Sequence, residues 1–423
     1  MTVTISPAPL RGKVSIIPSK SHLHRLLICA AFSDRETYIR SAPTQAEDVA
    51  ATVNCLVALG AKISRVTGGF QVTPVNLAAL PNSATLPCGE SGSTFRFMLP
   101  VVCALGVSAE FHMAGRLPER PLTPLTDQLQ SHGITISRPR PEILCTNGML
   151  IPGDFSIPGN ISSQYVTGLL FALPLLARSS RLTVEGAIES ENYISMTLQT
   201  LAEFGRQPDA DKNSYHITGG CAFRSPGDMY AEGDWSNAAF WLCAGALHGG
   251  SLTVQGLSKS SLQGDKEVIS ILEKMGAKAQ WHGDDVVVSE NKRNAVEFDA
   301  AGIPDLVPIL SLVAAVSDGR TVIKNAARLR MKESDRLASV TATLNALGAK
   351  VIEGSDSLSI DGVKSLKGGT VEAWGDHRIA MTAAIAACAC ENAVTIKGAQ
   401  AVSKSYPQFF DELASLGAHI VSS

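Results

Sequence analysis

Apolar residues recur along this chain in two kinds of segment that alternate, and each kind returns about every 70 residues. The first kind is amphipathic and ends in a glycine. Its six copies end LVALGAKI, LQSHGITI, LAEFGRQP, LEKMGAKA, LNALGAKV and LASLGAHI. Their glycines, 69 to 73 residues apart, are Gly60, Gly133, Gly205, Gly276, Gly348 and Gly417. Each copy predicts a helix that closes on its glycine and is followed by a strand.

The second kind of segment has a polar head and is then apolar nearly all round. Its six heads lie at Ser21, Ser93, Ser163, Asn237, Asp305 and His377. A helix that is apolar on every face is a buried helix. Short β-branched runs such as SLTVQG, RLTVEG and GRTVIKN between the helices predict strands. One repeat is therefore approximately a βαβαββ unit with one buried helix and one surface helix.

Six such units predict an α/β fold. A solenoid is the first alternative, but solenoid repeats usually span about 20 to 50 residues, which is shorter than this period. Two globular domains of three units each fit the repeat length better. Because no glycine- or serine-rich linker separates the two groups of units, we expect the chain to cross between domains in tight segments.

Composition narrows the class of protein. The 423 residues allow two or three domains, and the net charge of −3 without a basic tail disfavours nucleic-acid binding by bulk charge. The amino-terminal segment lacks a signal-peptide pattern, and the longest apolar runs are too short to span a membrane. Nine cysteines without a CxxC pair indicate free thiols in a reducing compartment. We therefore expect a cytoplasmic protein and, without an apolar surface stripe, a monomer.

The polar heads of the buried helices carry the candidate chemistry. Serine and aspartate at a helix start are ordinary N-caps, but Lys20, Gln164, His377 and Arg378 are poor caps. Free backbone N–H groups and the positive end of the dipole make a helix start an anion site.

Cations gather at or near the predicted helix starts, where they oppose the helix dipole. They are Lys20, Arg25, Arg96, Arg120, Lys332, Arg336, Arg378 and Lys404. A single run such as KESDR would ordinarily be a solvated helix face; the whole set points to small ligands with several negative charges. There is no GxxxxGK[ST], GxGxxG or HExxH motif and no Cys/His cluster, so we expect neither a nucleotide cofactor nor a metal.

At these same residues the sequence resembles the 5-enolpyruvylshikimate-3-phosphate (EPSP) synthase family of enolpyruvyl transferases. The matching segments, in order, are PSKSHLHR (18–25), CGESGSTFR (88–96), LPERP (117–121), ISSQY (161–165), EGDWSNAAF (232–240), IPD (303–305), RMKESDR (330–336), GDHRIAM (375–381) and SKSYPQF (403–409).

The resemblance implies two domains with threefold pseudo-symmetry, residues 1–19 plus 229–423 and residues 20–228, with the active site in a cleft between them. It also implies transfer of the enolpyruvyl group of phosphoenolpyruvate (PEP) to the 5-hydroxyl of shikimate 3-phosphate. Phosphate would be released by addition and elimination through a tetrahedral intermediate, in the pathway to chorismate and the aromatic amino acids.

The resemblance also implies roles for individual residues. Asp305 is the candidate base, Glu333 the candidate proton donor, and Lys20 a third catalytic group. Without the resemblance, Asp305 reads as an N-cap and Glu333 as a surface glutamate. Shikimate 3-phosphate is expected to contact Lys20, Ser21, Arg25, Ser162, Ser163, Gln164, Ser190, Tyr193, Asp305 and Lys332. PEP is expected to contact Lys20, Gly92, Arg120, Gln164, Arg336, Arg378 and Lys404. Arg96 and His377 are further candidates, and His377 is read either as a proton relay or as a structural histidine.

The chain departs from the family pattern at Pro18, Glu90, Phe97 and Arg328. We do not carry over the substrate contact that some members make at the position of Arg328.

The nearest alternative is the related UDP-N-acetylglucosamine enolpyruvyl transferase, which usually has a cysteine where this chain has Gly115. A non-catalytic scaffold would be favoured by loss of Asp305 or Glu333, and both are present. A repeat-built RNA-processing enzyme would need a catalytic histidine and a more basic surface.

Overall fold

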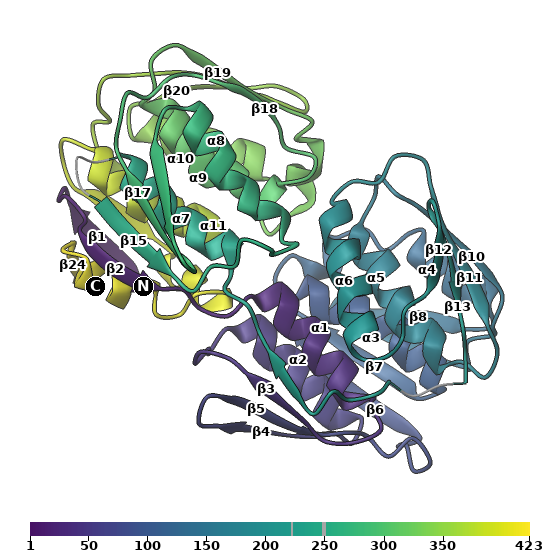
Figure 1. The fold of residues 1–423 in the computed structure, drawn as a ribbon. Coiled ribbons are helices and arrows are strands. Elements are labelled where there is room, and N and C mark those ends of the chain that lie inside the picture. The colour runs from purple at the N-terminus through teal and green to yellow at the C-terminus, as the bar shows by residue number, and fades with distance from the viewer. Residues whose placement is uncertain (221–222, 248–250) are drawn as a thin grey trace. The chain divides into compact units, whose positions relative to one another are not determined.

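The chain divides into two compact units in the computed structural model, which describes residues 1–220, 223–247 and 251–423. Unit 1 comprises Met1–Ser19, Thr44–Ala46 and Glu232–Ser423, and unit 2 comprises Lys20–Pro43 and Glu47–Ala231. Figure 1 shows both units as bundles of helices flanked by short strands.

Six four-stranded sheets, three in each unit, confirm the α/β class and the six repeats expected from the sequence. Every sheet has the strand order 1-2-4-3, counted along the repeat. Strands 1 and 2 are parallel, and strand 4 is antiparallel to both strand 2 and strand 3. This arrangement is the βαβαββ unit that the sequence pattern predicts.

The sheets of unit 2 repeat this order three times. In that order they are β14 (Asp228–Tyr230), β3 (Thr37–Arg40), β5 (Gly69–Thr73) and β4 (Lys62–Val66); β6 (Ser83–Gly89), β7 (Ser108–Met113), β9 (Ile143–Asn147) and β8 (Thr135–Arg140); and β10 (Asp154–Pro158), β11 (Ser180–Glu185), β13 (Ser214–Ile217) and β12 (Asp209–Asp211).

The sheets of unit 1 have the same arrangement. They are β2 (Gly12–Ser15), β15 (Ser251–Gln255), β17 (Asp285–Ser289) and β16 (Lys278–His282); β18 (Glu297–Asp299), β19 (Arg320–Lys324), β21 (Leu358–Asp361) and β20 (Lys350–Glu353); and β22 (Gly369–Glu372), β23 (Val394–Lys397), β1 (Thr2–Ser6) and β24 (His419–Ser422). The last sheet takes its fourth strand, β1, from the other end of the chain.

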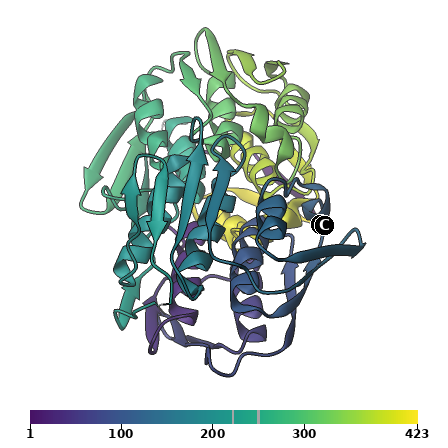
Figure 2. The ribbon, with the colours of Figure 1, turned by 90° about the vertical axis from the view of Figure 1, so that its right-hand side faces the viewer.

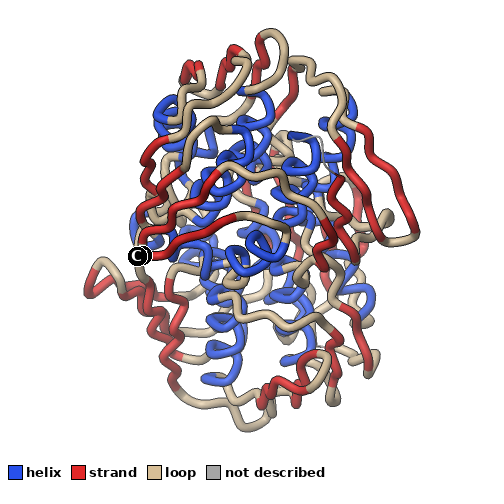
Figure 3. The backbone as a smooth tube through the Cα atoms, turned by 90° about the vertical axis from the view of Figure 1, so that its left-hand side faces the viewer, coloured by secondary structure: helices blue, strands red, loops and turns tan. Residues whose placement is uncertain are grey.

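The apolar segments form one helix per repeat, and these helices are buried on nearly every face, as the sequence predicts. They are α1 (Lys20–Ala31), α3 (Gly92–Leu105), α5 (Ser163–Ala172), α7 (Trp235–Leu247), α9 (Val307–Ala315) and α11 (His377–Ala386). In each unit the helices pack together inside and the strands lie toward the outside (Figure 2 and Figure 3).

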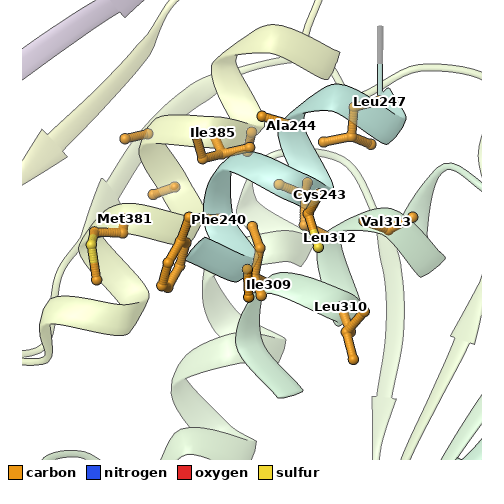
Figure 4. Close-up of a cluster of buried hydrophobic side chains, with 14 of the residues drawn as sticks. Phe240, Cys243, Ala244, Leu247, Ile309, Leu310, Leu312, Val313, Met381 and Ile385 are labelled. Atoms are coloured by element: carbon orange, nitrogen blue, oxygen red, sulfur yellow. The ribbon is translucent and has the colours of Figure 1, made fainter. Parts of the chain in front are cut away.

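Figure 4 shows the centre of unit 1, where side chains from three of these helices meet. Phe240 and Cys243 of α7 pack with Ile309 and Leu312 of α9 and with Ile385 of α11, and all five are fully buried. At about 25 cal/mol per Å² of apolar surface, each of the isoleucine, leucine and phenylalanine side chains contributes roughly 1.5–3 kcal/mol. This burial fixes the three helix starts in space.

The amphipathic segments form the second helix of each repeat. These are α2 (Glu47–Ala58), α4 (Leu125–Ser131), α6 (Glu191–Glu203), α8 (Val268–Lys274), α10 (Arg336–Ala346) and α12 (Phe409–Ser415). The six glycines that follow them have φ between 69° and 106°. Glycine adopts this left-handed conformation without steric cost, so the predicted helix endings are confirmed.

The chain exchanges strands where it passes from one unit to the other. β2 precedes α1 in sequence but pairs in parallel with β15 of unit 1. β14 precedes α7 in sequence but pairs in parallel with β3 of unit 2. In unit 1 the two passing segments meet at an antiparallel bridge between Pro18 and Gly233.

One buried glutamine ties these two segments together in unit 1. Gln263 Nε2 donates to the Gly233 carbonyl at 2.8 Å, and its Oε1 accepts from Ser19 Oγ at 3.0 Å and from the Trp235 amide at 3.1 Å. The buried amide thus anchors both passages on one side chain.

Candidate functional site

In unit 2 most of the predicted residues lie near helix starts, and α1 begins with the first of them. Lys20 is the first residue of α1, and its Nζ lies 2.7 Å from Asp48 Oδ2 near the start of α2. A lysine at this position is held by a carboxylate rather than by the helix dipole, which opposes it.

Arg25 lies one turn into α1 and ties it to α6. Its guanidinium donates to Thr197 Oγ1 at 2.9 Å, to the Ser21 carbonyl at 2.6 Å and to the Tyr193 carbonyl at 2.8 Å. It also lies 5.4 Å from the centre of the Phe97 ring. Burial lowers the pKa of Arg25 to about 10, which leaves the side chain charged at neutral pH.

The starts of α3 and α5 bring four further predicted residues together. Gln164 Oε1 accepts from Arg96 at 2.8 Å, and its Nε2 donates to Ser93 Oγ at 2.9 Å. Ser162 caps α5 by accepting from the Gln164 amide, and Ser163 is the first residue of that helix. Side chains from two repeats are therefore joined at adjacent helix starts.

Gly92 begins α3 beneath two guanidinium groups. A Cβ at this position would lie 2.8 Å from a terminal nitrogen of Arg120 and 2.9 Å from one of Arg96. Only a residue without a side chain leaves the first turn of α3 open to those arginines.

A chain of buried hydroxyls runs behind these helix starts. His24 Nδ1 is 2.7 Å from Thr52 Oγ1, which is 2.6 Å from Thr94 Oγ1, and Thr94 is 2.7 Å from Ser91 Oγ. Burial lowers the pKa of His24 to about 3, so its ring is neutral at physiological pH. These contacts hold α1, α2 and the capping Ser91 of α3 in register.

Ser190 precedes α6 with φ of 57°, in the left-handed region. This conformation is uncommon for a residue other than glycine and often marks a functional position. Tyr193 lies one turn further along, and its ring centre is 5.9 Å from the Arg25 guanidinium.

Glu90 is a departure from the family pattern whose surroundings are defined. A Cβ on Gly115 would lie 2.5 Å from the Glu90 carboxyl carbon, and Gly115 has φ of 54°. A cysteine at position 115, as in the related family, would therefore require the Glu90 side chain to move and would adopt a strained backbone conformation.

In unit 1 one arginine gathers three carboxylates. Arg336, the first residue of α10, donates to Asp305 at 2.6 Å, to Glu333 at 2.7 Å and to Asp376 at 2.8 Å. Its side chain is 1% exposed. The three acids raise the pKa of Arg336 despite its burial, so the guanidinium is permanently charged.

Asp305 is not a helix cap, because it lies in the turn η4 (Pro304–Leu306) with no capping hydrogen bond. Burial would raise the pKa of Asp305, but Arg378, Lys332 and Arg336 hold it well below its usual value. Arg378 lies 3.2 Å away and Lys332 3.6 Å away. Asp305 is therefore ionised and surrounded by cations.

At Lys332 the effect of burial on the pKa is larger than that of the neighbouring charges. Burial lowers the pKa of Lys332 to about 8, although neighbouring Asp305 favours the charged form. Its charge is consequently sensitive to pH near neutrality.

The start of α11 holds the GDHR segment. Asp376 caps the helix by accepting from the Arg378 amide at 2.9 Å, and it also accepts from Arg336. His377 is buried, with Nδ1 4.0 Å from Asp376 Oδ1. Both the relay and the structural interpretation of His377 remain compatible with this position.

Lys404 corrects the expectation that every cation lies near a helix start. It is the last residue of the 3₁₀ turn η7 (Ala399–Lys404), and α12 begins only at Phe409. The intervening Pro407 disfavours a helical conformation at Tyr406, so α12 starts only after the proline. The lysine is buried at the end of η7.

Three acids in these clusters received no role from the sequence. Asp48 is the second residue of α2, Asp265 lies in the turn η3 (Gly264–Glu267) before α8, and Asp376 reads as an ordinary N-cap. A partial signal was available for Asp48, whose repeat has Lys20 at its other helix start, but not for Asp265, whose repeat has Asp234 and Ser236 there. Pattern alone does not show that the two starts of one repeat lie together.

Comparison with known proteins gives a consistent result over the whole chain. The sequence model of the EPSP synthase (3-phosphoshikimate 1-carboxyvinyltransferase) family matches residues 5–413. The chain is 41% identical over 419 residues to 3-phosphoshikimate 1-carboxyvinyltransferase of Clostridium kluyveri, covering 99% of this chain and 98% of the relative. It is 42% identical over 426 residues to the Clostridium acetobutylicum protein of the same name, covering 99% and 98%.

Solved structures show the same fold at lower identity. The EPSP synthase from Acinetobacter baumannii aligns over 100% of both chains with a TM-score of 0.81 and 23% identity. The enolpyruvyl transferase NikO from Streptomyces tendae aligns over 99% of this chain and 98% of its own, with a TM-score of 0.80 and 20% identity. Among the described residues, no helix combines the length and apolar composition that a membrane crossing needs.

Proposed function

This chain belongs to the EPSP synthase family, and from that premise we propose which of its residues bind the two substrates and move the protons. It transfers the enolpyruvyl group of PEP to shikimate 3-phosphate in the shikimate pathway, as the sequence motifs led us to expect.

The chemistry sets the requirements for the site. The 5-hydroxyl of shikimate 3-phosphate loses a proton as its oxygen bonds to C2 of PEP, and the PEP methylene gains a proton. The resulting tetrahedral intermediate then loses a proton from its new methyl group as its bond to the phosphate oxygen breaks, which restores the carbon–carbon double bond and releases phosphate. Two carboxyl groups in opposite roles and several cations for phosphates and carboxylates satisfy these requirements.

One observation supports the assignment of these two carboxyl groups: the Arg336 guanidinium binds both Asp305 and Glu333. Asp305, kept ionised by three cations, is the base that takes the hydroxyl proton. Glu333 supplies the proton to the methylene. Lys20, paired with Asp48, is the third catalytic group.

The remaining roles follow the family motifs. Shikimate 3-phosphate is bound by the residues at the helix starts of unit 2, with Asp305 and Lys332 from unit 1. The unit 2 residues are Lys20, Ser21, Arg25, Ser162, Ser163, Gln164, Ser190 and Tyr193. PEP is bound by Lys20, Gly92, Arg120, Gln164, Arg336, Arg378 and Lys404, and Arg96 supports Gln164. That both sets face one cleft between the domains stays a prediction.

The test separates binding from turnover. Asp305→Asn and Glu333→Gln are expected to lower kcat by about 10²–10⁴-fold, the usual contribution of a general acid or base. Phosphate release from shikimate 3-phosphate and PEP measures turnover, and isothermal titration measures substrate binding. Asp299→Asn, a surface aspartate of the same repeat, is the matched control and should keep full activity.

Full turnover in either variant would refute its acid or base role. Phosphate release with UDP-N-acetylglucosamine in place of shikimate 3-phosphate would favour the related transferase; we expect none, because position 115 is glycine where that family usually has a cysteine.

We also propose that the enzyme is a cytoplasmic monomer. All eight cysteines in the described part of the chain are free, and Cys221 lies outside it. Even Cys55 and Cys88, whose sulfurs are 3.9 Å apart, are unbonded, which fits a reducing compartment. Sedimentation velocity at micromolar concentration should give a single species of 44.5 kDa.

A further inference from the structure

Asp265, in the turn η3 (Gly264–Glu267) of unit 1, is a buried carboxyl group that the proposed mechanism does not use. Its exposed fraction is 0%. Oδ2 contacts the Ser236 hydroxyl in a very short hydrogen bond, and Oδ1 has no hydrogen-bond partner among the described residues. An ionised carboxylate would be costly in such a place, whereas a neutral carboxylic acid is tolerated.

A short path of contacts connects Asp265 with the candidate base. Ser236, whose hydroxyl contacts Asp265, accepts at its backbone carbonyl from Arg378 at 3.5 Å. The same Arg378 nitrogen donates to the Asp305 carbonyl at 3.3 Å, and the other terminal nitrogen lies 3.2 Å from Asp305 Oδ2. Arg378 therefore contacts both Asp305 and the residue whose hydroxyl binds Asp265.

The charges around Asp265 favour its neutral form. The groups that act on it are Asp234 beside α7, Asp305 in η4 and Arg378 in α11. The nearby Lys266 is engaged elsewhere, because its Nζ donates to the carbonyls of Lys259 and Ser261. Burial first, and then Asp305, raise the pKa of Asp265 to about 7, while Arg378 opposes the shift.

We propose that Asp265 is a positioning residue for the transfer reaction: as a neutral acid it fixes Ser236 and thereby holds Arg378 against Asp305. In this form its O–H donates to Ser236 Oγ, and the positive charge of Arg378 remains available to Asp305 and to PEP. Once ionised, Asp265 competes for Arg378. The inference rests on the proposed function, because it uses the PEP-binding role of Arg378.

Two neighbouring carboxyl groups generally differ in protonation state. When like charges lie close together, one group stays ionised and the other keeps its proton, and the pair titrates as a unit. Here three cations select Asp305 as the ionised member, and Asp265, with only a hydroxyl contact, is the protonated member.

The test compares Asp265→Asn, which is permanently neutral and of the same shape, with wild type between pH 6 and pH 8.5. In wild type, the KM for PEP should rise about tenfold as Asp265 ionises and draws Arg378 away. In Asp265→Asn this rise should disappear, while kcat at pH 6 stays within about twofold of wild type. PEP itself and the cationic side chains titrate equally in both proteins, so the difference between the two pH profiles reports the ionisation of Asp265. An identical pH profile in both proteins would overturn the proposal.

Two further measurements separate positioning from folding. Infrared spectra of the whole enzyme at pH 6 should contain the band of a buried protonated carboxylic acid, and Asp265→Asn should lack it. Ser236→Ala, which removes the link but keeps Asp265, should raise the KM for PEP severalfold at pH 6. Absence of the band in wild type, or an unchanged KM in Ser236→Ala, would contradict the proposal.

The wild-type assay distinguishes failure of this inference from failure of the proposed function. If wild type converts its substrates but the Asp265→Asn comparison fails, only the role of Asp265 falls. If Arg378→Ala leaves the KM for PEP unchanged, Arg378 does not bind PEP, and the inference about Asp265 is wrong as well.

Discussion

The pKa values of single side chains in the site depend on the balance between burial and neighbouring charges. Asp305 and Lys332 lie 3.6 Å apart, and both are displaced from their usual titration range. The pKa of Asp305 falls because three cations outweigh burial. The pKa of Lys332 falls because burial, together with Arg336 and Arg328, outweighs the carboxylates of Asp305 and Glu333. The cluster thus has a fixed anion next to a cation that is close to losing its proton.

The pH dependence of shikimate 3-phosphate binding follows from Lys332. Its pKa, lowered by burial to about 8, means that the lysine loses its charge as the pH rises through 8. The KM for shikimate 3-phosphate is therefore expected to increase between pH 7.5 and pH 9. Lys332→Arg keeps its charge in this range and should abolish the increase. Steady-state kinetics against pH check this, and an increase that persists in the arginine variant would contradict the role of Lys332.

Individual residues also show how far the sequence could be interpreted. The motifs identified Arg336 and Asp305 as site residues, but their direct contact was not predictable because they lie 31 positions apart. Asp265 escaped notice for a related reason. A lone aspartate before an amphipathic helix reads as a cap, and only its burial in the folded chain shows otherwise.

At the scale of the elements, the contact between α3 and α5 sets the geometry of the unit 2 cluster. A Cβ on Gly168 of α5 would lie 2.4 Å from the Arg96 carbonyl and 2.8 Å from Pro100 Cγ of α3. The two helices approach closely because this position has no side chain. The hydrogen bond between Arg96 and Gln164 depends on that approach.

Gly168→Ala is expected to push these helices apart and to lower the free energy of unfolding by about 1–3 kcal/mol, the usual cost of overpacking. Urea denaturation followed by circular dichroism measures this change. Gly302→Ala is the control, because a Cβ there meets nothing within 4 Å and its φ is ordinary. Equal stability of the two variants would show that α3 and α5 can separate without cost.

The helices were the most predictable elements. Their buried and amphipathic faces follow from local periodicity, and the glycines that end the outer helices need a left-handed conformation that few other residues adopt. The strands were found as segments, but their partners were not. Local pattern showed SLTVQG to be a strand, yet nothing in it shows that β15 pairs with β2, which lies before α1.

At the scale of the whole molecule, the exchange of β2 and β14 makes each unit depend on a strand from a distant part of the sequence. Val14 of β2 is 4% exposed and faces the core of unit 1, although α1 of unit 2 begins six positions later. A substitution that disrupts β2 should therefore lower the stability of unit 1.

Val14→Asp is expected to destabilise unit 1 by about 3 kcal/mol or more, because it buries a charge without a partner. Hydrogen exchange with mass spectrometry should show faster exchange in β15 and β17, and no change in β3 and β5. Ser15→Asp adds the same charge at an exposed neighbouring position and is the control. Faster exchange confined to β3 would contradict the strand assignment.

The closing of the last sheet by β1 has a consequence for biosynthesis. Thr4 of β1 contacts Thr395, 391 residues further along the chain. At roughly 5–20 residues per second, β1 leaves the ribosome roughly 20–80 s before its partner strands. Every strand of unit 2, in contrast, is available once Ala231 has emerged. The nascent chain can thus complete unit 2 during translation, while Val3 and Ile5 wait, unburied, as a target for chaperones.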